Sequence, residues 1–117
     1  MFDFEKLEVY QVTKIQNLDF MRWLVQNKEL DKDIAEQWKA ANMGTVLNLA
    51  ESTARMTHPE KKHYLTIARG NINTCVAFLE VAKEFGWIDA AMSEQFYAKY
   101  EQMSKMMLGM IRSFSEK

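Results

Sequence analysis

The chain offers very few places where a helix could end. Its 117 residues include four glycines and one proline, and the stretches between them are rich in Ala, Leu, Met, Glu, Lys and Gln, which favour helix. The alternating pattern that is typical of strands is absent. The sequence therefore predicts an all-α fold, and its length fits one domain over residues 1–117.

Three short regions interrupt the helical pattern and divide the chain into four segments of about 20 to 28 residues. They run from Asn27 to Asp33, from Thr57 to His63 and from Gly86 to Asp89. Thr57 and Glu60 match a capping box, which begins a helix. Gly86 can adopt the left-handed conformation that ends one, and Asp89 can cap the next. Because such short connections make successive segments antiparallel, we expect an up-down-up-down four-helix bundle.

The third and fourth segments each have one clear core stripe. In the third, the stripe keeps a heptad register through Leu65, Ala68, Ile72, Cys75, Leu79 and Ala82. In the fourth, spacings of three and four connect Met92, Phe96, Tyr100, Met103, Met107, Met110 and Phe114. We expect both stripes to face the interior of the bundle.

The first two segments carry more apolar surface than one bundle covers, which is only about half of each helix. In the first, we expect a core face made of Leu7, Tyr10, Ile15, Leu18, Met21 and Val25. The surplus residues on the opposite faces are Val9, Val12, Phe20 and Trp23 in the first segment and Met43, Val46 and Leu47 in the second. Exposed apolar patches usually mark protein contacts, so these seven residues predict self-association.

Charge and hydropathy narrow the range of functions. Fifteen Lys and Arg against sixteen Asp and Glu give a net charge of -1, without the positive field that most nucleic-acid binders use. No stretch has the roughly 20 apolar residues that cross a bilayer, and the start MFDFEK lacks the features of a signal peptide. The single cysteine excludes an internal disulfide. We expect a cytoplasmic protein without a membrane partner.

Two patterns could carry chemistry, and each also has a structural interpretation, which we favour. Glu60 and His63 form the Glu-x-x-His half of a carboxylate-bridged metal site, but the second copy that such a site requires is missing. Cys75 lies in the core stripe, where a thiol behaves as a small apolar group with a raised pKa. We therefore expect no catalytic residues, no metal and no cofactor.

Two charged features lie near the turn between the second and third segments. If these segments fold back about position 60, Glu51 and Arg69 lie level, which predicts a partly buried salt bridge or shared polar network. Arg55, Lys61 and Lys62 concentrate positive charge there, which could attract RNA, DNA or an acidic partner. An ordinary solvated surface is the alternative that we favour for this patch.

Four short motifs follow one another along the chain. They are Phe-Glu-Lys-Leu-Glu-Val-Tyr-Gln from Phe4, Asn-Leu-Ala-Glu from Asn48, Leu-Thr-Ile-Ala-Arg-Gly from Leu65 and Ala-Lys-Glu-Phe-Gly-Trp-Ile from Ala82. In this order and spacing the chain resembles the four-helix-bundle proteins encoded in intervening sequences of bacterial 23S ribosomal RNA genes. That family includes the accessory variability determinant proteins of diversity-generating retroelements.

The resemblance implies an antiparallel four-helix bundle that assembles into a ring-like homopentamer without assigned catalytic residues. We therefore expect a non-enzymatic oligomeric scaffold or adaptor whose partner is another copy of itself. The alternative is an accessory factor that binds nucleic acid or a nucleoprotein such as a reverse transcriptase. The retroelement members are strongly basic, whereas this chain is nearly neutral.

Overall fold

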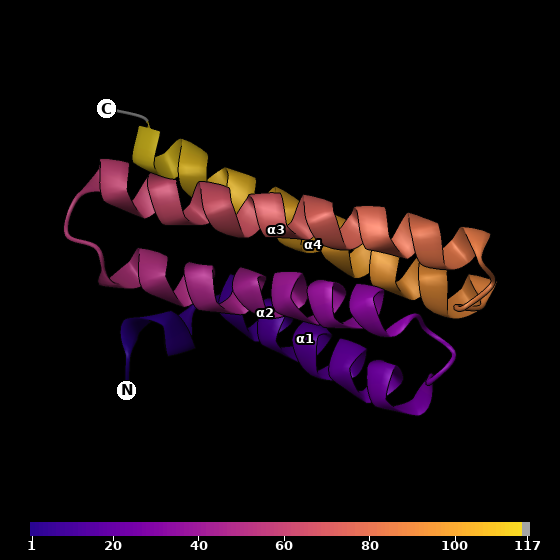
Figure 1. The fold of residues 1–117 in the computed structure, drawn as a ribbon. Coiled ribbons are helices and arrows are strands. Elements are labelled where there is room, and N and C mark those ends of the chain that lie inside the picture. Colours follow the sequence, from indigo (N-terminus) through magenta and orange to yellow (C-terminus); the bar gives the residue numbers. More distant parts are fainter. Residues whose placement is uncertain (116–117) are drawn as a thin grey trace.

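Helices account for nearly all of the chain that the structure covers. The computed structural model describes residues 1–115 and begins with a short 3-10 helix, η1 (Asp3–Lys6). The four α-helices are α1 (Glu8–Gln26), α2 (Lys32–Ala54), α3 (His58–Glu84) and α4 (Ala90–Ser115), as Figure 1 shows. The prediction of an all-α fold with four helices is confirmed, and residues 1–115 contain no strand.

The chain turns back at each of the three connections between the α-helices (Figure 1). Among neighbouring helices, α2 and α3 pack against each other most extensively, and α1 and α4 pack least. The bundle is elongated, with extents of 47 × 26 × 23 Å. Within the described part of the chain, no helix is both long enough and apolar enough to span a bilayer.

The helix boundaries follow from local hydrogen bonds that the sequence predicts. The side chain of Thr57 accepts a hydrogen bond from the backbone N–H of Glu60 at 3.3 Å, which is one of the two bonds of a capping box. Asp89 accepts the backbone N–H of Met92 at 2.8 Å and so caps the start of α4. Gly86 ends α3 with a φ of 72°, a conformation that glycine adopts without steric cost.

The predicted stripes of α3 and α4 form much of the core. The stripe of α3 is buried over its whole length: Leu65, Ala68, Ile72, Cys75, Leu79 and Ala82. In α4 the middle of the stripe is buried, namely Phe96, Tyr100, Met103 and Met107, while its ends at Met92, Met110 and Phe114 are half-buried against the core. Both predictions are confirmed.

An aromatic cluster fills the core between α1, α2 and α4. The ring centroid of Phe20 lies 4.9 Å from that of Trp38, and the centroid of Trp23 lies 5.6 Å from that of Phe96. The rings of Trp23 and Phe96 meet edge to face, with an angle of 85° between their planes. Such aromatic pairs add stability beyond the area that they bury.

The predicted orientation of α1 is wrong for its outer face and for half of its core face, whereas Leu7, Tyr10 and Met21 pack against the core as expected. Three residues expected on its outer face are buried in the core, namely Val9, Phe20 and Trp23, and Val12 is half-buried against it. Three residues expected in the core are instead 51%, 43% and 69% exposed: Ile15, Leu18 and Val25. The physical reason is volume, because the two large rings fill a space that Ile, Leu and Val side chains leave partly empty.

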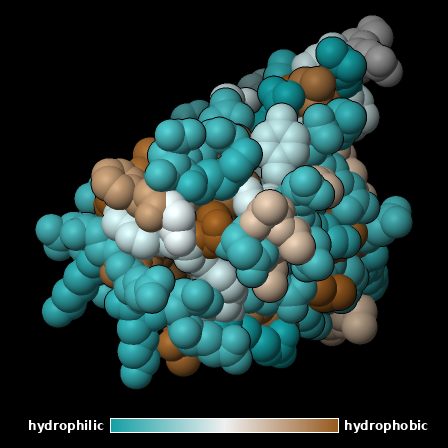
Figure 2. Space-filling model, turned by 90° about the vertical axis from the view of Figure 1, so that its right-hand side faces the viewer, coloured by the Kyte–Doolittle hydropathy of each residue, from teal (hydrophilic) through white to brown (hydrophobic). Residues whose placement is uncertain are grey.

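The end of the bundle with the α1–α2 and α3–α4 connections is mainly polar. Figure 2 looks onto this end, where hydrophilic side chains predominate and hydrophobic ones are scattered between them. Ile88 is buried just before α4, and Trp87 is half-buried beside it. Dispersed apolar side chains of this kind are normal on a protein surface.

Candidate functional site

A polar network joins all four α-helices at the centre of the core. Nδ2 of the fully buried Asn42 on α2 donates to Oε1 of Gln16 at 3.1 Å and to Oδ1 of Asn17, both on α1. Oδ1 of Asn42 accepts hydrogen bonds from the hydroxyl of Tyr100 on α4 and from the thiol of Cys75 on α3, the latter at 3.6 Å. This network was not predicted from the sequence, although polar residues at core positions of α1 and α2 were the signal that could have revealed it.

Burial keeps the two ionisable groups of this network protonated. It raises the pKa of the Cys75 thiol from 9.0 to about 12, and the nearby hydroxyl of Tyr100 offsets part of that rise. Burial also raises the pKa of the Tyr100 hydroxyl well above 10.0, although Trp38 Nε1 donates to its oxygen at 3.2 Å and acts in the opposite direction. The predicted place of Cys75 in the core is confirmed, because its side chain is fully buried.

Glu51 and Arg69 do not form the predicted pair. Oε1 of Glu51 accepts a hydrogen bond from Nη2 of Arg55 at 2.8 Å, one turn further along α2. Nε of Arg69 donates to the carbonyl oxygen and to the hydroxyl oxygen of Ser104 on α4, both at 3.1 Å. The prediction is wrong because the two side chains face different surroundings: Glu51 lies on the exposed face of α2, whereas Arg69 reaches α4.

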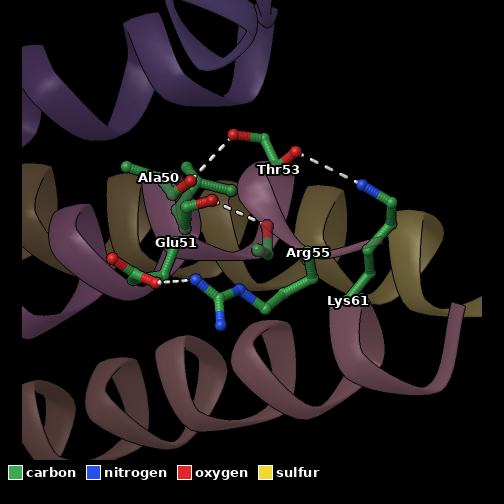
Figure 3. A network of polar contacts seen from close by, with 7 residues as sticks. Ala50, Glu51, Thr53, Arg55 and Lys61 are labelled. Carbon is green, nitrogen blue, oxygen red and sulfur yellow. Dashed lines mark hydrogen bonds and ion pairs between the residues drawn. The ribbon is translucent and has the colours of Figure 1, made fainter. Parts of the chain in front are cut away.

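The predicted cationic patch lies where α2 meets α3 (Figure 3). Besides its ion pair, Arg55 places its guanidinium carbon 5.0 Å from the ring centroid of Tyr64. Nζ of Lys61 donates to the carbonyl oxygen of Thr53 at 3.3 Å. Lys62 makes no ion pair within residues 1–115. Two of the three cations therefore already have protein partners.

The outer faces of α1 and α2 carry five exposed, large apolar side chains. These are Ile15, Leu18 and Val25 on α1 and Met43 and Leu47 on α2, which we call the α1–α2 apolar face. The two helices adjoin at this level, because Nδ2 of the buried Asn17 lies 3.6 Å from Sδ of Met43. Met43 and Leu47 thus lie on the surface as predicted, whereas Val46 is half-buried.

Comparison with known proteins identifies the family. Residues 5–109 match the family model described as 23S rRNA-intervening sequence protein. The chain belongs to the family of 23S rRNA-intervening sequence proteins. The resemblance predicted from its four motifs is therefore confirmed, although no curated protein gives a significant match.

The fold of this 23S rRNA-intervening sequence protein also occurs in a solved structure. A protein of unknown function from the S23 ribosomal protein family of Bacteroides thetaiotaomicron superposes with a TM-score of 0.79. The match covers 88% of this chain and 97% of that one. Since the two sequences are 15% identical, the likeness shows a shared fold alone.

The motifs that define this 23S rRNA-intervening sequence protein have structural roles. The side-chain amide of Asn48 donates to the carbonyl oxygen of Gly44 at 2.9 Å, within α2. Arg69 connects α3 to α4 through Ser104, and Gly86 ends α3. Of these three motif residues, Arg69 connects two helices, whereas Asn48 and Gly86 act within or at the end of a single helix.

The Glu-x-x-His pattern of this 23S rRNA-intervening sequence protein lies in the first turns of α3. The backbone of Glu60 takes part in the cap at Thr57, and the ring of His63 packs edge-on against Tyr64 with centroids 5.3 Å apart. Over the described residues, 1–115, no three His, Cys, Asp or Glu side chains gather in a way that could hold a metal ion.

Proposed function

We propose that this chain is a non-enzymatic scaffold or adaptor, and that it acts in the cytoplasm as a ring-like homo-oligomer of antiparallel up-down-up-down bundles. The observation that carries this proposal is the α1–α2 apolar face. Ile15, Leu18 and Leu47 are 51%, 43% and 58% exposed on adjoining helices. Large apolar side chains that are exposed on two neighbouring helices are candidates for a protein contact.

Two distinct apolar rows favour a ring over a symmetric pair. One row belongs to α1 and the other to α2, so the α1 row of one copy can pack against the α2 row of the next. A head-to-tail contact between two different surfaces closes into a ring when its rotation allows. The number of five subunits comes from the family resemblance.

Native mass spectrometry of the wild-type chain tests the assembly. We expect a species of five times the 13.7 kDa of one chain. Leu18→Glu and Leu47→Glu each introduce a charge into the contact, so both variants are expected to be monomeric with unchanged helical circular dichroism.

A matched control separates this contact from general surface effects. Ile67 on α3 is 39% exposed, and Ile67→Glu is expected to leave the mass of the assembly unchanged. A monomeric wild-type protein at micromolar concentration contradicts the proposal. Retention of the wild-type assembly by both Leu→Glu variants contradicts it as well.

A second proposal is an accessory role on nucleic acid or a nucleoprotein, and it rests on the cationic end of the bundle. In a ring, the positive charges of Arg55, Lys61 and Lys62 are repeated in every subunit, which strengthens their combined field. The double variant Lys61→Glu, Lys62→Glu is expected to weaken binding to a structured RNA and to reduce its dependence on salt. Absence of RNA binding by the wild type at low salt contradicts this role.

A further inference from the structure

The helix α1 is attached to the rest of the bundle less extensively than any other α-helix. It packs against α2 and α4, but the packing of α2 with α3 and of α3 with α4 is far more extensive. A groove of about 690 Å³ also lies between α1 and α4. Elements with few packing contacts are the ones that open locally while the rest of a protein stays folded.

The side of α1 that faces the core is half polar. Three of its six buried residues are polar, namely Thr13, Gln16 and Asn17, whereas the six buried residues of α3 include no amide or alcohol side chain. Oγ1 of Thr13 has no hydrogen-bond partner within residues 1–115. Because water can bind these polar groups once α1 detaches, separating α1 costs less free energy than separating an equally long apolar helix.

We propose that α1 opens as a unit while α2, α3 and α4 remain folded together. Since α3 packs extensively on both α2 and α4, these three helices keep a shared core when α1 leaves. Most of the stability of a protein helix comes from its packing, so the 19 residues of α1 lose their helical structure as they detach. The opening uncovers Asn42 and the inner faces of α2 and α4. It does not depend on the proposed assembly.

The single cysteine of the chain can report this opening. Cys75 on α3 is fully buried, and its thiol donates to Oδ1 of Asn42 on α2. The amide nitrogen of Asn42 donates in turn to Gln16 and Asn17 on α1. The helix α1 therefore lies on the other side of Asn42 from the thiol. When α1 detaches, a path to Cys75 opens between α2 and α4, and a thiol reagent can reach it without global unfolding.

The rate at which Cys75 reacts with dithiobisnitrobenzoate, measured at several low urea concentrations, tests the proposal. The measurement uses the Leu47→Glu variant, which is expected to be monomeric. We expect the reactive form to be about tenfold or more as populated as the globally unfolded chain. Its population is also expected to rise less steeply with urea than that of the unfolded chain, because opening of one helix exposes less surface.

Two matched glycine variants identify the helix that opens. Lys14 on α1 and Lys99 on α4 are exposed, and neither forms an ion pair within residues 1–115. Glycine weakens a helix by a similar amount at either position, so both variants lower global stability alike.

In the open form α4 is still helical and α1 is not. Lys14→Gly is therefore expected to speed the reaction of Cys75 about three- to fivefold, and Lys99→Gly to leave its rate unchanged. Equal rates of acceleration in the two variants would mean that the thiol reacts only after global unfolding, and would overturn the proposal. Acceleration in Lys99→Gly alone, or in neither variant, would overturn it as well, as would a urea dependence equal to that of global unfolding.

Discussion

The hydroxyl of Tyr100 on α4 donates a hydrogen bond to Oδ1 of Asn42 on α2, and both side chains are fully buried. These two helices are diagonal in the bundle and do not pack directly against each other. A bond between them crosses the centre of the core. Because buried polar groups require specific partners, this bond favours one register of the helices over neighbouring ones.

Tyr100→Phe removes the strongest donor to Asn42 and the acceptor of Trp38 Nε1. Leaving such groups unpaired in the core is expected to lower the free energy of unfolding by about 1–3 kcal/mol, measured by urea denaturation. Tyr97 is 47% exposed, and Tyr97→Phe is the matched control, with an expected change within about 0.5 kcal/mol. Equal effects of the two variants would show that the buried hydroxyl contributes nothing specific.

The stability of the fold is expected to fall at alkaline pH because of Cys75. Its thiol has a pKa of about 12 in the fold against 9.0 in an unfolded chain, so the fold retains the proton longer. This contribution is complete below pH 9.0 and is lost as the pH rises toward about 12. The Tyr100 hydroxyl, whose pKa is also raised, acts in the same direction above its ordinary value of 10.0.

The measurement is the free energy of unfolding in urea at several pH values above 9.0. Each protected proton contributes a slope of up to about 1.4 kcal/mol per pH unit. Cys75→Ala lacks the thiol, so its stability is expected to decline less steeply than that of the wild type. The comparison of slopes is independent of the small cavity that the substitution leaves. Parallel curves for the two proteins would mean that the thiol is not protected by the fold.

The sequence predicts the fold well where a helix has only one apolar row that could face the core. On α3 only one stripe keeps a heptad register, so Leu65 and Leu79 could be assigned to the core in advance. On α1 two apolar rows have equally good helical periodicity. Choosing between them depends on the volume that Phe20 fills between the other helices, and periodicity carries no information about that volume.

The site was predictable only in part, because rotation about the helix axis is not encoded in sequence spacing. Glu51 and Arg69 were expected to lie level along the bundle, yet Glu51 forms an ion pair with Arg55 four residues away on its own helix. The buried position of Asn42 was not predicted, because a polar residue within an apolar row looks like a break in that row. Its partners belong to α1, α3 and α4, so only the assembled bundle shows that its hydrogen bonds are satisfied.

The orientation of α1 leads to a direct test with two alanine substitutions. Phe20 is fully buried, so Phe20→Ala is expected to lower the free energy of unfolding by about 3–5 kcal/mol. Ile15 is 51% exposed, so Ile15→Ala is expected to change it by less than about 0.5 kcal/mol. Both are measured in a Leu47→Glu background, which is expected to be monomeric. A larger loss of unfolding free energy for Ile15→Ala than for Phe20→Ala would show that α1 has the opposite orientation.

The contact between Gly44 on α2 and Asn71 on α3 limits the side chain that position 44 can carry. A Cβ added to Gly44 would lie 2.6 Å from Nδ2 of Asn71, which must then move. Gly109 has no atom within 4 Å of the equivalent position. Because alanine is favoured over glycine in helices, Gly109→Ala is expected to stabilise the fold by about 0.5–1 kcal/mol. Gly44→Ala is expected to give no such gain, or a loss.

A double-mutant cycle separates the close contact from helix propensity. Asn71→Ala removes the amide that obstructs position 44, so in this background Gly44→Ala is expected to stabilise the fold as much as Gly109→Ala does. The interaction energy between positions 44 and 71 is then about 0.5–3 kcal/mol, measured from urea unfolding of the four proteins. Additive effects would contradict the close approach of α2 and α3 at this level, because two groups that do not touch have no reason to couple.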